Sequence, residues 1–152
     1  MGYLEDSFYD LRQSIVGSGI QLSQSSRPLV LAVDDDEDNL LLMAYALEQP
    51  NCTLLAAKDG KSALSLAQTY QPNLILLDIL LPDLSGIEVV SQLRQDPRTA
   101  KIPVIAVTAF AKPEDRERLI VAGCNDYICK PYLLEDLEAL IQPYLSSALI
   151  IS

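Results

Sequence analysis

The chain has 152 residues, of which 49% are hydrophobic, enough for one ordinary domain with a packed core. Its 21 acidic and 11 basic residues give a formal net charge of -10, so we expect no direct binding to nucleic acid, which needs a basic surface. The chain contains no histidine, which excludes a phosphohistidine donor and a Ser-His-Asp hydrolase.

Residues 1–27 differ in pattern from the rest of the chain. Leu4, Phe8, Leu11 and Ile15 recur at helical spacing, and the glycine and serine residues that follow them indicate a linker. We interpret this segment as an N-terminal extension, either a frayed tail or a short amphipathic helix that docks on this domain or on a partner. The sequence shows neither a secretory signal nor the roughly 18-residue apolar run of a membrane span, so we expect a cytoplasmic protein without membrane contact.

Repeated units of a short apolar run, a polar loop and a helical pattern fill the chain from residue 28 onward. The apolar runs are continuous rather than alternating, which is typical of parallel strands covered on both faces. We predict strands at 28–33, 53–57, 74–77, 104–107 and 126–128. We predict helices from the acidic loop to about 49, and then at 61–70, 86–95, 113–123 and 134–145.

Five strands that alternate with five helices predict an α/β fold, a doubly wound parallel sheet with helices on both faces. Pro113 suits the first position of a helix, because no backbone donor is needed there, and Gly123 suits the position where that helix ends. We assign residues 28–145 to this domain and 146–152 to a short C-terminal tail. Sheets of this kind bind ligands beyond the carboxyl ends of their strands.

Polar side chains stand at or just beyond the carboxyl ends of four predicted strands. Asp34 and Asp35 follow the first strand, and Asp78 follows the third. Thr108 ends the fourth strand, and Lys130 comes shortly after the fifth. Because the carboxyl ends of parallel strands meet at one edge of a sheet, we expect these five side chains to lie close together.

Such a cluster has the parts that phosphoryl transfer requires. Three neighbouring carboxylates resist ionisation unless a cation offsets their charge, and Mg²⁺ prefers oxygen ligands of this kind. A hydroxyl at Thr108 and an ammonium at Lys130 could hold phosphoryl oxygens. Taken singly, each residue also has an ordinary structural interpretation, such as a solvated acidic loop that caps a helix or a surface lysine.

Four blocks of this sequence resemble the receiver domains of two-component response regulators. The blocks are, in chain order, 30–35, 74–86, 103–109 and 123–131, and they keep the order and spacing of that family. The resemblance covers roughly residues 28–145. It implies a flavodoxin-like fold with strand order 2-1-3-4-5. Because only a short tail follows the last predicted helix, we expect a stand-alone receiver without an attached effector domain, unless the chain is a fragment of a larger regulator.

The resemblance also implies roles for individual residues. Asp78 would be the phosphoacceptor and a metal ligand. Asp35 would bind Mg²⁺ directly, Asp34 would act mainly through a bound water, and the backbone carbonyl of Leu80 would complete the protein ligands.

The phosphoryl group itself would be held by Thr108 and Lys130, and the peptide before Pro131 would be cis. Thr108 would also act with Tyr127 as a switch, because its movement towards the phosphoryl group leaves room for the tyrosine ring to turn inward. The surface around the fourth helix, the fifth strand and the fifth helix would then change shape.

The implied donor is a sensor histidine kinase or a phosphotransfer protein, and the implied output is contact with a downstream protein target, with homodimerisation left open. The domain would phosphorylate and slowly dephosphorylate itself, and would not be a turnover enzyme. Magnesium is the only cofactor that we expect.

Three other interpretations remain open at this point. A pseudo-receiver would keep the fold as an interaction module without phosphorylation. A phosphohydrolase of the haloacid-dehalogenase type would use Asp34 as its nucleophile, although Asp38 stands where that motif has threonine or valine. A flavin- or nucleotide-binding module would need a phosphate loop rich in backbone donors, where this chain has an acidic loop.

Overall fold

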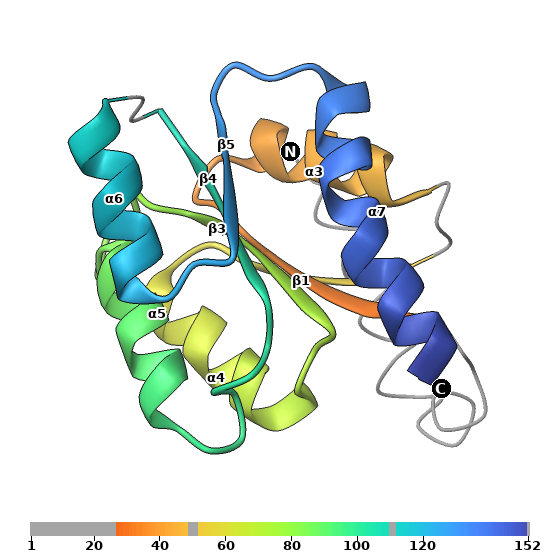
Figure 1. Cartoon of the computed structure of the whole chain (residues 1–152), viewed down its shortest axis with the longest axis horizontal. Coiled ribbons are helices and arrows are strands. Elements are labelled where there is room, and N and C mark those ends of the chain that lie inside the picture. Colours follow the sequence, from red (N-terminus) through yellow and green to blue (C-terminus); the bar gives the residue numbers. More distant parts are fainter. Residues whose placement is uncertain (1–26, 49–51, 110–111, 152) are drawn as a thin grey trace.

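The structure is a computed structural model that describes residues 27–48, 52–109 and 112–151, with side chains as far as 146 (Figure 1). The amphipathic pattern predicted for the N-terminal extension lies outside the described residues. The predicted end of the first helix, at about 49, also lies outside them.

Five parallel strands form one sheet in the order β2-β1-β3-β4-β5, as predicted. Their bounds lie within one residue of those expected from the sequence. The strands are β1 (Leu29–Val33), β2 (Thr53–Ala57), β3 (Leu74–Asp78), β4 (Val104–Thr108) and β5 (Asp126–Cys129).

Each of the five described helices follows a strand in the chain. They are α3 (Glu37–Glu48), α4 (Gly60–Tyr70), α5 (Gly86–Gln95), α6 (Pro113–Ala122) and α7 (Leu134–Ile151). None of these helices combines the length and the apolar character that crossing a bilayer demands.

The last helix is longer than predicted. The sequence pattern ended it at Leu145 and left a short tail, whereas α7 continues to Ile151. Extending an existing helix costs far less than starting one, and no glycine follows Leu145 to stop it. The predicted end of the last helix at Leu145 was therefore wrong.

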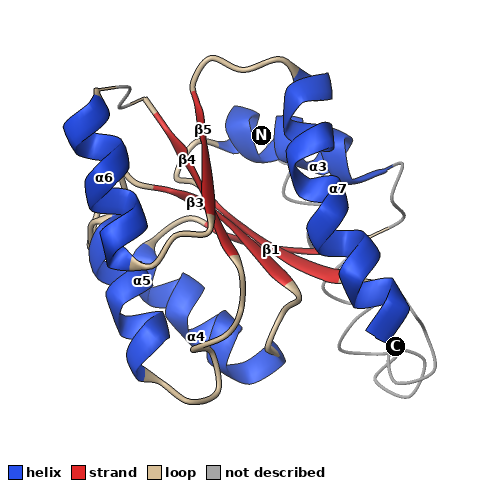
Figure 2. Cartoon of the chain, in the orientation of Figure 1, coloured by secondary structure: helices blue, strands red, loops and turns tan. Residues whose placement is uncertain are grey.

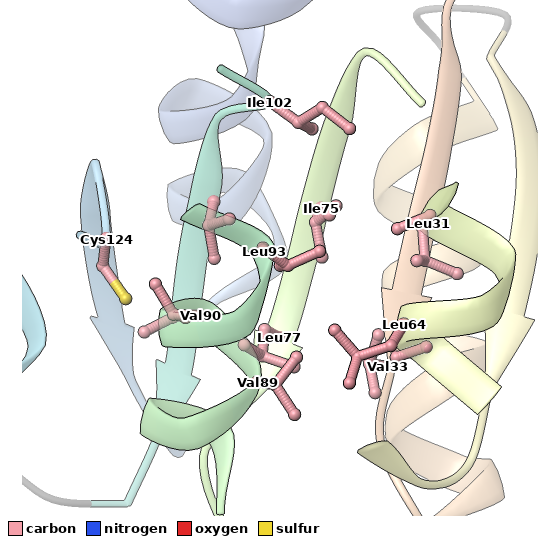
Figure 3. Packing of buried hydrophobic residues seen from close by; sticks show 14 of the residues in the cluster. Leu31, Val33, Leu64, Ile75, Leu77, Val89, Val90, Leu93, Ile102 and Cys124 are labelled. Carbon is pink, nitrogen blue, oxygen red and sulfur yellow. The ribbon is translucent and has the colours of Figure 1, made fainter. Parts of the chain in front are cut away.

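Helices cover both faces of the sheet, with α4, α5 and α6 on one side and α3 and α7 on the other (Figures 1 and 2). Side chains alternate along each strand: Leu31 and Val33 enter the first core, and Val30 and Ala32 enter the second. Figure 3 shows the first core, where side chains of α4 and α5 pack on β1 and β3. Burial on both faces explains why the strand sequences are continuously apolar.

Two glycines fix the loops at the ends of α5 and α6. Gly86 begins α5 so close to β3 that an added Cβ would lie 2.6 Å from the Cα of Ile79, a distance that would force the backbone apart. Gly123 ends α6 in the left-handed conformation, with φ 118°, as the sequence predicted.

At the amino edge of the sheet, Arg94 of α5 joins two loops. Its Nε and Nη2 donate to the carbonyl of Gly123 at 3.1 and 2.8 Å. Its Nη1 donates to the carbonyls of Ala100 at 3.1 Å and Ile102 at 2.8 Å. Nη2 also reaches the side-chain oxygen of Asn125 at 3.1 Å, so all three nitrogens have partners.

Candidate functional site

The site lies at the carboxyl edge of the sheet, where the structure gathers the residues singled out from the sequence. Asp34 directly follows β1, and Asp78 is the last residue of β3. Asp78 pairs with Val107 across β3 and β4, so Thr108 ends its strand one position farther on. The backbone N–H of Lys130 donates to the carbonyl of Thr108 at 2.7 Å, which fixes the loop after β5 beside the same edge.

Three carboxylates meet at this edge. Asp34, Asp35 and Asp78 each offer an oxygen, and these oxygens all lie within 4.8 Å of one another. Asp34 is fully buried, and Asp78 is only 4% exposed. Asp35 is exposed, so the cluster opens to solvent on one side.

The ammonium of Lys130 bridges two of these carboxylates. Its Nζ donates to Oδ2 of Asp34 at 2.9 Å and to Oδ2 of Asp78 at 3.3 Å. The peptide bond between Lys130 and Pro131 is cis, as the resemblance implied. The side chain of Lys130 therefore reaches back across β4 to the ends of β1 and β3.

Backbone and amide donors hold the remaining oxygens of the two buried carboxylates. Oδ1 of Asp34 accepts the N–H of Asp36 at 2.9 Å and the side-chain amide of Asn39 at 3.4 Å. Oδ1 of Asp78 accepts the N–H of Leu80 at 3.0 Å. These contacts orient both carboxylates without neutralising the charge that they share.

Burial and charge act against each other in this cluster. Burial raises the pKa of Asp78, and the neighbouring charge of Asp34 adds to that, while the Leu80 amide and Lys130 lower it; the net direction is upward. Burial alone would lower the pKa of Lys130, but its bonds to Asp34 and Asp78 raise it overall. Lys130 thus stays protonated and positively charged.

The loop after Asp78 is tied to the start of α4. The carboxylate of Asp83 accepts the N–H of Gly60 at 2.7 Å and that of Lys61 at 2.9 Å. These backbone bonds, that of Gly60 first, lower the pKa of Asp83 to about 2. Asp59 caps the same helix through the N–H of Ser62 at 2.7 Å, so two carboxylates serve one helix start.

An ion pair at the carboxyl edge of the sheet was not predicted from the sequence. Lys58, which directly follows β2, pairs with Glu37 in the first turn of α3. Its position directly after β2 is the sequence signal that points to Lys58, because ligands bind at the carboxyl ends of the strands. Asn39 was also missed, since its contact with Asp34 depends on how α3 leaves the acidic loop.

Tyr127 does not join the cluster but lies on β5, in register with Ala106 of β4. Its ring is partly buried against the core under α4, α5 and α6. The guanidinium carbon of Arg116, on α6, lies over the ring at 5.2 Å from its centroid. The side chain of Tyr127 therefore occupies the junction between β5 and α6.

A family model provides the decisive comparison. The model for the response regulator receiver domain matches residues 30–142, which is most of the chain. The chain belongs to the response regulator receiver domain family. This confirms the resemblance seen in the sequence, and a haloacid-dehalogenase-type or nucleotide-binding assignment is not supported.

Curated relatives agree with this assignment. The polar-differentiation response regulators DivK of Brucella anthropi and Brucella ovis are each 41% identical to this chain over 119 residues. Each alignment covers 78% of this chain and 97% of the relative. These relatives are therefore receivers of nearly the length of the matched region.

Solved receiver structures share the fold. The chemotaxis response regulator CheY4 of Vibrio cholerae is 26% identical, with a TM-score of 0.73 over 78% of this chain and 98% of that protein. The receiver domain of the sensor histidine kinase PA1611 from Pseudomonas aeruginosa is 29% identical, with a TM-score of 0.72 over 79% of this chain and 98% of that domain. That receiver domain was solved with a magnesium ion coordinated in its active-site cleft.

Proposed function

We propose that Asp78 accepts a phosphoryl group from a histidine kinase or a histidine phosphotransfer protein. The observation that carries this proposal is the position of Asp78, buried at the strand end with Lys130 at 3.3 Å and two further carboxylates within reach. Because these 152 residues contain no histidine, the phosphohistidine must lie outside them. The response regulator receiver family supports the same reaction class.

In this reaction an oxygen of Asp78 attacks phosphorus in line with the leaving nitrogen of the donor imidazole. The new O–P bond forms as the P–N bond breaks, and the electron pair of the P–N bond returns to the nitrogen. The donor leaves as neutral imidazole if its other ring nitrogen is protonated. Lys130 already contacts Asp78 and would balance charge on a phosphoryl oxygen. Thr108 follows Val107, the residue paired with Asp78, and its hydroxyl would donate to another phosphoryl oxygen.

The acidic cluster fits a magnesium ion. Three oxygens within 4.8 Å of one another are hard ligands, and one ammonium cannot neutralise three carboxylates. Asp34, Asp35, Asp78 and the backbone carbonyl of Leu80 would hold the ion. When bound, Mg²⁺ would offset the negative charge that otherwise repels a phosphoryl donor.

Phosphorylation replaces the single charge of the Asp78 carboxylate by a phosphoryl group with a charge of about -1.5 to -2 at a buried position, and this change would drive a switch. We propose that Thr108 moves towards this charge and that Tyr127 turns inward into the space left behind. The surface formed by α6, β5 and α7 would then change shape and be recognised by a downstream protein, or by a second copy of the chain. The domain would act as a switch rather than as an enzyme with turnover.

We also propose that residues 28–145 are the receiver unit and that residues 1–27 are an addition to it. The family model begins at residue 30, and 119 aligned residues already fill 97% of the DivK relative. Deleting residues 1–26 should therefore leave phosphorylation intact.

Intact-mass measurement with acetyl phosphate and Mg²⁺ tests the proposed chemistry. Wild type should gain one phosphoryl group, and the gain should disappear in Asp78→Asn and when Mg²⁺ is omitted. Asp36→Asn is the matched control, because it removes the same charge from the same edge of the sheet but lies outside the three-carboxylate cluster. Failure of wild type to react with acetyl phosphate and to bind beryllofluoride would favour a pseudo-receiver instead.

A further inference from the structure

The contact between Arg116 and Tyr127 joins two elements that the proposed switch moves. Arg116 is an exposed residue of α6, and Tyr127 is a partly buried residue of β5. The guanidinium carbon lies 5.2 Å from the ring centroid, within the range of about 6 Å that a cation–π interaction requires.

We propose that Arg116 is a positioning residue that holds the ring of Tyr127 beside α6 and so stabilises the resting state of the switch. This inference rests on the proposed function, because it assigns a restraint to the ring movement proposed there. The ring can turn inward only by leaving the guanidinium, so every molecule that reaches the active state must first lose this contact.

The helix that carries Arg116 follows in the chain the strand that Thr108 ends. Thr108 is the last residue of β4, and α6 begins only five positions later, at Pro113. Arg116 lies in the first turns of that helix, where its N–H donates to the carbonyl of Lys112 at 3.2 Å. Arg116 therefore lies close in the chain to the residue whose movement the proposed switch requires.

The size of the effect follows from the exposure of Arg116. Solvent weakens a cation–π contact at the surface, and losing it should shift the switch equilibrium about two- to fivefold towards the active state. A ligand that binds the active state should gain apparent affinity by the same factor as long as the resting state predominates.

Arg118 provides a matched control on the same helix. It is also exposed, but its side chain lines the groove between α5 and α6, together with Ile87 and Ser91 of α5. Arg116→Gln and Arg118→Gln therefore remove the same charge from the same helix on two different sides. Only the first should affect Tyr127.

The test combines two measurements on the full chain. The first is the concentration of beryllofluoride, with Mg²⁺, that gives half-maximal binding. The second is the ¹⁹F NMR signal of Tyr127 in the ligand-free protein labelled with 3-fluorotyrosine, assigned by its loss in Tyr127→Phe. The chain has seven tyrosines, so this assignment is practicable.

Arg116→Gln should lower the half-maximal beryllofluoride concentration about two- to fivefold and shift the Tyr127 signal, and Arg118→Gln should change neither. Arg116→Lys keeps a cation and should lie closer to wild type. In a Tyr127→Leu background the effect of Arg116→Gln should vanish, because the ring that it covers is gone.

Equal shifts in the two glutamine variants, or a full effect of Arg116→Gln in the Tyr127→Leu background, would overturn the inference. Failure of wild type to bind beryllofluoride would instead count against the proposed function. In that case the ligand-free NMR signal would still decide whether Arg116 positions the ring of Tyr127: a response to Arg116→Gln but not to Arg118→Gln supports this, and no response rejects it.

Discussion

Charged side chains lie at both edges of the sheet, but their charges are balanced in different ways. At the amino edge, the guanidinium of Arg94 is matched by fixed acceptors, including the carbonyls of Gly123 and Ile102. At the carboxyl edge, three carboxylates lie together, and the ammonium of Lys130 is bonded to two of them, Asp34 and Asp78. A charge that the fold satisfies by itself contributes to stability, whereas an excess of one sign leaves room for a ligand.

The same comparison separates stability from function. Bonds between Arg94 and backbone carbonyls need nothing from outside the chain, so this network should be important for folding and unimportant for phosphoryl transfer. The acidic cluster should behave in the opposite way, because crowding like charges costs free energy in the absence of a cation. Substitutions at each edge therefore test whether stability and function separate in this way.

The largest effect on stability is expected at the amino edge. Arg94→Ala should lower the free energy of unfolding by about 2–3 kcal/mol, because several part-buried carbonyls lose a charged donor at once. Urea denaturation would measure the loss, and the folded fraction should still accept a phosphoryl group. Arg98→Ala is the control: this exposed arginine pairs with Asp96 in its own turn, and its loss should leave the free energy of unfolding close to the wild-type value. Similar losses for both arginines would contradict the proposed role of the network.

A smaller effect, on function alone, is expected at the carboxyl edge. Asp35→Asn should raise the Mg²⁺ concentration for half-maximal phosphorylation by at least about tenfold, because it removes an exposed ligand from the cluster. The free energy of unfolding should change by less than about 0.5 kcal/mol, since Asp35 is exposed. Titration with Mg²⁺ and acetyl phosphate would measure the first quantity, and Asp36→Asn should leave it near the wild-type value. A large loss of stability in Asp35→Asn would show that the two edges do not differ as described.

The smallest effect concerns the loop that follows Asp78 at the carboxyl edge, and it depends on pH. The folded pKa of Asp83 is about 2, below its ordinary value of 3.8, so the ionised carboxylate stabilises the fold above pH 3.8. This contribution is lost as the pH falls towards about 2. Asp83→Asn should therefore lower the melting temperature at pH 7, and the difference from wild type should shrink steadily in melts below pH 4. A difference that stays constant over this range would exclude the ionised carboxylate as its source.

The sequence predicted the parts of this molecule that depend on local pattern. Continuous apolar runs located the strands, and Pro113 and Gly123 marked the two ends of α6. The shared edge of a parallel sheet then brought Asp34, Asp78 and Lys130 together, as expected from their positions after separate strands.

Contacts that depend on packing between distant segments could not be predicted in this way. The partners of Arg94 come from loops that meet only after α5 and α6 have packed on the sheet. The reach of Asp83 to the start of α4 and the position of Arg116 over Tyr127 likewise depend on the tertiary arrangement. The length of α7 was missed for a different reason, because the mixture of serine, alanine, leucine and isoleucine after Leu145 does not show whether an established helix continues.

The most direct test of the central claim is to identify the residue that carries the phosphoryl group. The protein would be phosphorylated with acetyl phosphate and Mg²⁺, reduced at once with borohydride, which converts an aspartyl phosphate to homoserine, and then digested and sequenced by mass spectrometry. The proposed function predicts homoserine at position 78 and an unchanged residue at Asp34 and Asp35. Homoserine at either of those two positions, with Asp78 intact, would contradict it.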